Sequence, residues 1–125
     1  MGSDLPVRDV PLTGLVERRQ AVRRPVRRPI IGHVLPVERS VILRDISPAG
    51  FSVLAATMNL TLGAAYEFRF EVDLEAVVVR ARLAHAMRIR GDRTVGYLAG
   101  FEFIDAQRDE AAIAVLLAQA RMDAI

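Results

Sequence analysis

Arginine residues are concentrated near the start of the sequence, in a spacing that suits the recognition of phosphate groups. Six of the 17 arginines lie between positions 18 and 28, and Arg18, Arg19 and Arg23 form the pattern RRxxxR. A guanidinium group can bind phosphate oxygens through two parallel hydrogen bonds, pair with guanine O6 and N7, or stack on a purine ring. Lysine, which is absent from the chain, would offer only a point charge. These arginines are therefore predicted to bind a ligand that carries phosphate and base groups.

A second polar cluster, residues 45–50, has the sequence DISPAG and the pattern DxSxxG. Asp45 can accept hydrogen bonds from the N1–H and N2–H groups of guanine, and Ser47 can bond to the same edge. Gly50 is predicted either to adopt a positive φ or to let the backbone pass close to a ligand. Taken singly, each cluster has a plainer interpretation, because the arginines could form a solvated basic surface and DxSxxG an ordinary turn.

The arginine-rich segment, residues 17–28, contains three RxxxR pairs. Arg19 with Arg23 is the preferred pair, because Pro25 and Pro29 disrupt the pairs that lie further along. The remaining arginines are less certain contributors: Arg24, Arg27 and Arg28. Like charges and prolines oppose local order, so this segment is predicted to be mobile until a ligand binds.

The composition predicts one folded domain without redox or metal chemistry. A chain of 125 residues with 52% hydrophobic content is long enough to bury a single core. It has no cysteine, no apolar run of about 20 residues to cross a membrane, and no secretory signal at its start. His33 and His85 have no second ligand at metal-binding spacing, and no nucleophile and base are arranged for catalysis. We expect a cytoplasmic protein that is not an enzyme and uses no metal or cofactor.

Six strands are predicted after a loose N-terminal arm at residues 1–16. The clearest is residues 66–73, in which apolar and charged side chains alternate. The full set covers residues 26–37, 40–45, 51–54, 66–73, 76–89 and 95–103. Prolines in the first of these favour an edge strand or an irregular strand. Short connections between the strands favour an all-β domain that forms a six-stranded antiparallel barrel.

The end of the sequence changes to a helical period. Apolar residues at positions 113, 116, 117 and 120 follow the i, i+3, i+4, i+7 spacing of one helix face. They predict a C-terminal helix over residues 107–122, with Asp105 or Asp109 as its N-cap. This helix is expected to cap the barrel or to meet a partner.

RRxxxR followed by DxSxxG, with a strand between them, resembles the two binding motifs of the PilZ domain, the bacterial receptor module for cyclic di-GMP. The late segment GYLAGFEF, residues 96–103, is also similar to a strand of that family. The resemblance implies a split six-stranded barrel with a C-terminal helix over residues 17–125. It assigns the binding roles to Arg19, Arg23, Asp45, Ser47 and Gly50. An arginine at the position of Arg18 implies binding of an intercalated pair of ligand molecules.

The resemblance implies a cyclic di-GMP receptor that changes conformation on binding and so regulates an unidentified protein partner. Motility, exopolysaccharide or virulence are the outputs that the family implies. One alternative is an adaptor of the same fold that binds proteins and no nucleotide. Another is a nucleic-acid-binding barrel, but the chain has only seven aromatic residues, most at inward strand positions, so no DNA or RNA partner is expected. A monomer or weak homodimer is expected.

Overall fold

The computed structural model describes residues 22–36, 39–91 and 95–120, and the loose arm predicted at 1–16 lies outside them. The described residues form six strands and one helix. These are β1 (Arg24–Leu35), β2 (Arg39–Ser47), β3 (Gly50–Ala55), β4 (Ala65–Val72), β5 (Glu75–Arg90), β6 (Val95–Phe103) and α2 (Glu110–Leu117). The six predicted strands are confirmed, and β6 has the predicted bounds, residues 95–103.

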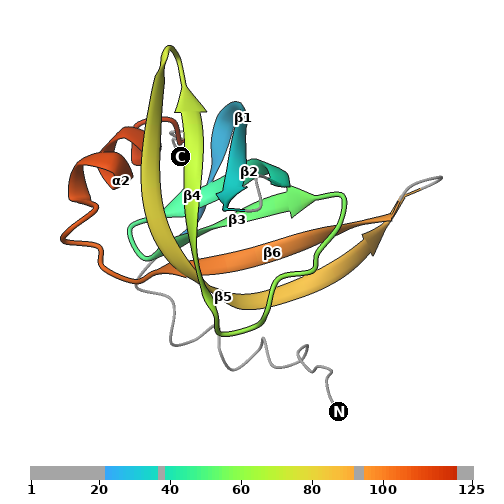
Figure 1. Cartoon of the computed structure of the whole chain (residues 1–125). Coiled ribbons are helices and arrows are strands. Elements are labelled where there is room, and N and C mark those ends of the chain that lie inside the picture. The colour runs from blue at the N-terminus through green and yellow to red at the C-terminus, as the bar shows by residue number, and fades with distance from the viewer. Residues whose placement is uncertain (1–21, 37–38, 92–94, 121–125) are drawn as a thin grey trace.

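The strands pair into a closed antiparallel barrel in the order β1-β2-β3-β6-β5-β4 (Figure 1). The predicted six-stranded barrel with a C-terminal helix is therefore confirmed. β1 pairs with both β2 and β4, so the prediction of an edge strand was wrong. The alternative of an irregular strand was right, because the pairing of β1 with β2 shifts register between Pro25 and Ile30.

Phenylalanine rings fill the centre of the barrel. Phe51, Phe68, Phe70 and Phe101 are each 0% exposed. The Phe51 ring packs edge-on against Phe68 at a centroid distance of 5.0 Å and stacks on Phe101 at 5.4 Å. Alternation along β3, β4 and β6 turns these rings inward and leaves the intervening residues on the outer face.

The C-terminal helix is shorter than predicted and is attached to the barrel at both of its ends. It spans Glu110–Leu117 instead of 107–122, and residues 121 and 122 lie outside the described part of the chain. Asp109 occupies the N-cap position, but its Oδ2 accepts a hydrogen bond from the Arg80 amide of β5, at 3.0 Å, instead of capping the helix. After the helix, Ala120 pairs with Val26 of β1. No helix in the described part of the chain has the length and apolar character needed to span a bilayer.

Candidate functional site

The two sequence motifs come together at the start of β1, where one residue of each lies close to the other. The Arg23 guanidinium lies 3.8 Å from Asp45 Oδ1, with the two side chains 31% and 22% exposed. The pairing of β1 with β2 produces this contact, because it sets Pro25 opposite Asp45. Arg18 and Arg19 lie outside the described residues. Of the preferred pair, Arg19 and Arg23, the structure therefore describes Arg23, which lies beside the turn.

A bulge directs Asp45 to the outer face of the barrel. In the pairing of β2 with β3, Leu43 is opposite Val53 and Asp45 is opposite Ser52, which leaves Arg44 as an extra residue. Without this extra residue, strict alternation would turn the Asp45 side chain inward, as it does that of Leu43. Asp45 Oδ1 is buried and accepts no hydrogen bond, and 3.8 Å is too long for one from Arg23. The carboxylate thus has an unused acceptor, which a ligand donor could reach once the groups that cover it move.

The Ser47 hydroxyl supports the turn between β2 and β3. Its Oγ accepts hydrogen bonds from the amides of Ala49 and Gly50, at 3.1 and 3.2 Å, and donates to the Gly50 carbonyl at 3.4 Å. These bonds use the two acceptor sites and the one donor of a hydroxyl, and Ser47 is only 1% exposed. In this conformation the hydroxyl shapes the turn. The contact with guanine that the sequence predicted would require Ser47 to leave these partners.

Gly50 is needed at its position for a reason that the sequence did not indicate. Its φ is not positive, since Gly63 is the glycine with a positive φ among the described residues. A Cβ atom at Gly50 would overlap the carbonyl oxygen of Phe101 in β6 and would lie 3.1 Å from Glu102 Cα. The close approach is therefore between two strands of the barrel, and it holds the turn against β6.

Replacing Gly50 with alanine is expected to lower the free energy of unfolding by about 1–3 kcal/mol, because the new methyl group meets backbone atoms that cannot rotate away. Urea denaturation followed by far-UV circular dichroism measures this change. Ala49→Ser, at the exposed neighbouring turn position, is the matched control and should leave the midpoint unchanged. Equal stability of Gly50→Ala and the wild type would contradict the close approach of β3 and β6.

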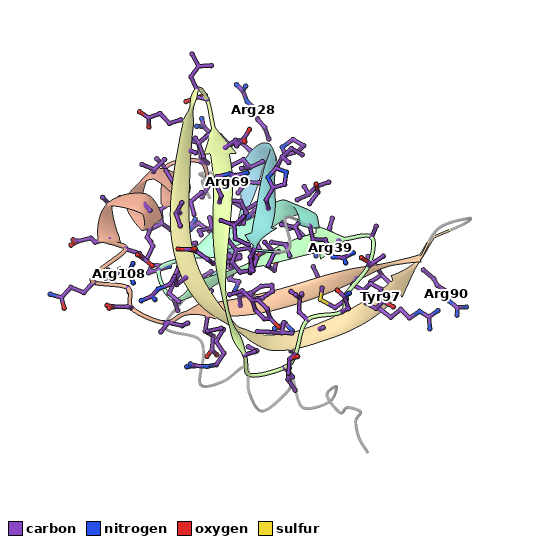
Figure 2. The ribbon with its side chains drawn as sticks, viewed as in Figure 1. Arg28, Arg39, Arg69, Arg90, Tyr97 and Arg108 are labelled. Atoms are coloured by element: carbon purple, nitrogen blue, oxygen red, sulfur yellow. The ribbon has the colours of Figure 1, made fainter. Side chains whose placement is uncertain are left out.

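Arg24, Arg27 and Arg28 lie on β1, and Arg24 is opposite Ile46, beside the turn. Arg27 is engaged at the end of the helix, where its amide donates to the Gln119 carbonyl at 2.9 Å and its guanidinium to Ala118 at 3.4 Å. Arg28 projects outward from β1 (Figure 2). The prediction of a mobile segment was wrong for Arg24 to Arg28, because these residues belong to a strand. Pro29 is accommodated within the stretch of β1 where pairing with β2 is interrupted.

Small side chains continue the site across the outer face. Asp45 is opposite Ser52 of β3, and Ser52 is opposite Gly100 of β6. The Ser52 hydroxyl oxygen is buried and has no hydrogen-bond partner. Ser52 lies outside both sequence motifs, and its place beside Asp45 depends on the strand register. The site therefore combines a guanidinium, a carboxylate and a hydroxyl on the outer face of the barrel, beside a glycine, which suits a polar ligand.

A closed six-stranded barrel that carries an arginine and an aspartate beside a turn on its outer face defines a class of small β domains. The family model of the PilZ domain matches residues 17–119. The chain belongs to the PilZ domain family, as the two sequence motifs predicted. Among the described residues, no three His, Asp or Glu side chains are grouped as they would be around a metal ion.

Solved structures share this fold. The PilZ domain of YcgR from Escherichia coli, determined with c-di-GMP, has a TM-score of 0.66 at 15% identity, covering 82% of this chain and 91% of that one. The inhibitor of motility MotI (DgrA) from Bacillus subtilis has a TM-score of 0.57 at 15% identity, covering 81% and 50%. The PilZ domain of CeSA from a cellulose-synthesizing bacterium has a TM-score of 0.51 at 20% identity, covering 78% and 95%. No curated protein matches the sequence.

Proposed function

We propose that this protein is a receptor for cyclic di-GMP. The observation that carries the proposal is the meeting of Arg23 with Asp45, one residue from each motif, on the outer face of the barrel. Membership of the PilZ family supports it, as does the similarity in fold to the YcgR domain that was determined with c-di-GMP.

The chemistry of these groups fits the ligand. Asp45 Oδ1, which accepts no hydrogen bond within the protein, can accept from guanine N1–H and N2–H. The Arg23 guanidinium can bind a phosphate oxygen or guanine O6 and N7. Arg18 and Arg19 would add to this clamp from the segment before β1, and Arg18 would favour a pair of ligand molecules. Binding then exchanges the Arg23–Asp45 contact for contacts of both residues with the ligand.

Ligand binding would regulate a protein partner in the bacterial cytoplasm. Closing the arginines that precede β1 over the outer face would replace a basic surface by one that carries a bound nucleotide, so a partner could distinguish the two states. A motility, exopolysaccharide or virulence output would follow from that partner. This part of the proposal rests on the family, and a partner captured only in the presence of cyclic di-GMP would support it.

Arg23→Ala is expected to weaken cyclic di-GMP binding by roughly 10- to 100-fold, the range for a lost charge-assisted hydrogen bond. Arg27→Ala is the matched control, because Arg27 contacts the end of the helix and should bind the ligand like the wild type. Isothermal titration calorimetry of the full chain measures both, and its stoichiometry tests the role given to Arg18. No binding by the wild type would favour the adaptor that binds no nucleotide. A loss confined to Arg27→Ala would show that a different pair of arginines is used.

A further inference from the structure

His85 is brought to the same outer face by a second bulge. In the pairing of β5 with β6, Leu83 is opposite Phe101 and His85 is opposite Gly100, so Ala84 is an extra residue. Strict alternation would have turned His85 inward, on the same side as Leu83. Bulges that change the direction of a side chain are frequent beside binding sites. The bulge at Ala84 thus turns the His85 side chain outward, as the bulge at Arg44 turns that of Asp45.

Asp45 and His85 lie at the two ends of one cross-strand row of residues on the barrel surface. The row runs from Asp45 through Ser52 and Gly100 to His85, one residue from each of β2, β3, β6 and β5. Neighbouring strands lie about 4.8 Å apart, so Gly100 is roughly 10 Å from Asp45 along this row. Ser52 and Gly100 form a low floor, and the two ends of the row carry the larger side chains.

The imidazole ring reaches from β5 over this floor. A Cβ atom at Gly100 would overlap Nε2 and Cε1 of His85, so the ring occupies the space above the glycine. His85 is nevertheless exposed, so the residue faces solvent on the outer face. The ring therefore extends the site toward Asp45 from the opposite end of the row.

No other ring in the described part of the chain has this position. The fully buried phenylalanines point into the barrel. Tyr97 is opposite Ala55, and Tyr66 is opposite Ala81, so both tyrosines stand at inward positions of the register. A base that stacks on the floor beside Asp45 and Ser52 would find His85 as its planar neighbour.

We propose that His85 is a further ligand-contacting residue, which binds the second base of cyclic di-GMP while Asp45 holds the first. This inference rests on the proposed function. A cyclic dinucleotide carries two bases on one phosphate-linked ring, so anchoring one base at Asp45 directs the rest of the ligand over Ser52 and Gly100. The His85 ring supplies a face for stacking, which is tolerant of base identity, and Nε2 supplies a polar contact.

Calorimetry of the full chain with cyclic di-GMP tests the contact. His85→Ala is expected to weaken binding roughly 5- to 100-fold, the range for loss of one base-stacking side chain. Gly100→Ala should weaken it as well, because the added methyl group displaces the imidazole. His33→Ala, which removes the outer-face histidine of β1, is the matched control and should bind normally. Wild-type affinity in His85→Phe would identify stacking as the contact. Wild-type affinity in His85→Gln would identify a polar contact.

Nuclear magnetic resonance gives a second readout that a purely structural role would not produce. The chain has two histidines, so the imidazole signals can be assigned with the two alanine variants. Saturation with cyclic di-GMP should shift the His85 ring signals and leave those of His33 in place. Normal affinity in His85→Ala combined with loss of binding in Asp45→Ala would overturn this inference and leave the proposed function intact. A wild type that does not bind cyclic di-GMP would overturn both.

Discussion

Asp45→Ala is expected to weaken cyclic di-GMP binding by roughly 10- to 100-fold, while the free energy of unfolding changes by less than about 1 kcal/mol. The loss of affinity follows from the paired guanine donors that would have no acceptor. The small change in stability follows from the environment of the carboxylate. Its buried Oδ1 accepts no hydrogen bond, and its ion pair with Arg23 is long and partly exposed. Loss of that ion pair is offset by release of a buried, unsatisfied oxygen.

Two further variants separate charge from shape at this position. Asp45→Asn keeps the size of the side chain but lacks the anionic charge, so it should bind more weakly than the wild type and more tightly than Asp45→Ala. Glu67→Ala removes an exposed carboxylate from the outer face of β4 and should change neither property. Calorimetry and urea denaturation of the same samples give both quantities. Normal affinity in Asp45→Ala, or loss of its fold, would contradict the role assigned to the turn.

Strand alternation made much of the barrel predictable. In residues 66–73 the pattern alone assigned Phe68 and Phe70 to one face and Glu67 to the other, and the structure places the phenylalanines inside. Such strands are predictable because apolar and charged side chains cannot exchange faces without lowering the free energy of unfolding.

The direction of the site residues could not be predicted, because it depends on bulges. One extra residue at Arg44 turns Asp45 outward, and one at Ala84 turns His85 outward, but neither leaves a distinctive local sequence. A pattern of period two continued through either position assigns the wrong face. The sequence therefore identified Asp45 by motif, and it gave no indication that His85 lies in the same row.

The arginine segment shows the limit of proline as a signal for strand boundaries. Pro25 and Pro29 suggested that the segment was not ordered, yet β1 begins at Arg24. Pro29 falls where pairing with β2 is interrupted, so the missing amide removes no bond from that ladder. Where such an interruption in pairing falls depends on the partner strand as well, so the sequence of β1 alone does not predict it.

The core residue next to the turn should give the largest change in stability. Phe51 follows Gly50 directly, is 0% exposed, and contacts four other phenylalanine rings. Phe51→Ala is expected to lower the free energy of unfolding by about 3–5 kcal/mol, a large part of the roughly 5–15 kcal/mol typical of a domain. The cost has two sources, because the variant loses the transfer of a benzyl group out of water and leaves a cavity among rigid rings.

Urea denaturation followed by far-UV circular dichroism measures this loss in a chain that has no tryptophan for fluorescence. Leu74→Ala at the turn between β4 and β5 is the control, because Leu74 is 100% exposed and its removal should change stability by no more than about 0.5 kcal/mol. Phe51 also stacks on Phe101, whose carbonyl lies against Gly50, so its loss loosens the strand that supports the turn. We therefore expect Phe51→Ala to bind cyclic di-GMP more weakly even where it remains folded. Wild-type affinity in the folded variant would mean that Gly50 and Ser47 hold the turn without the core beneath it.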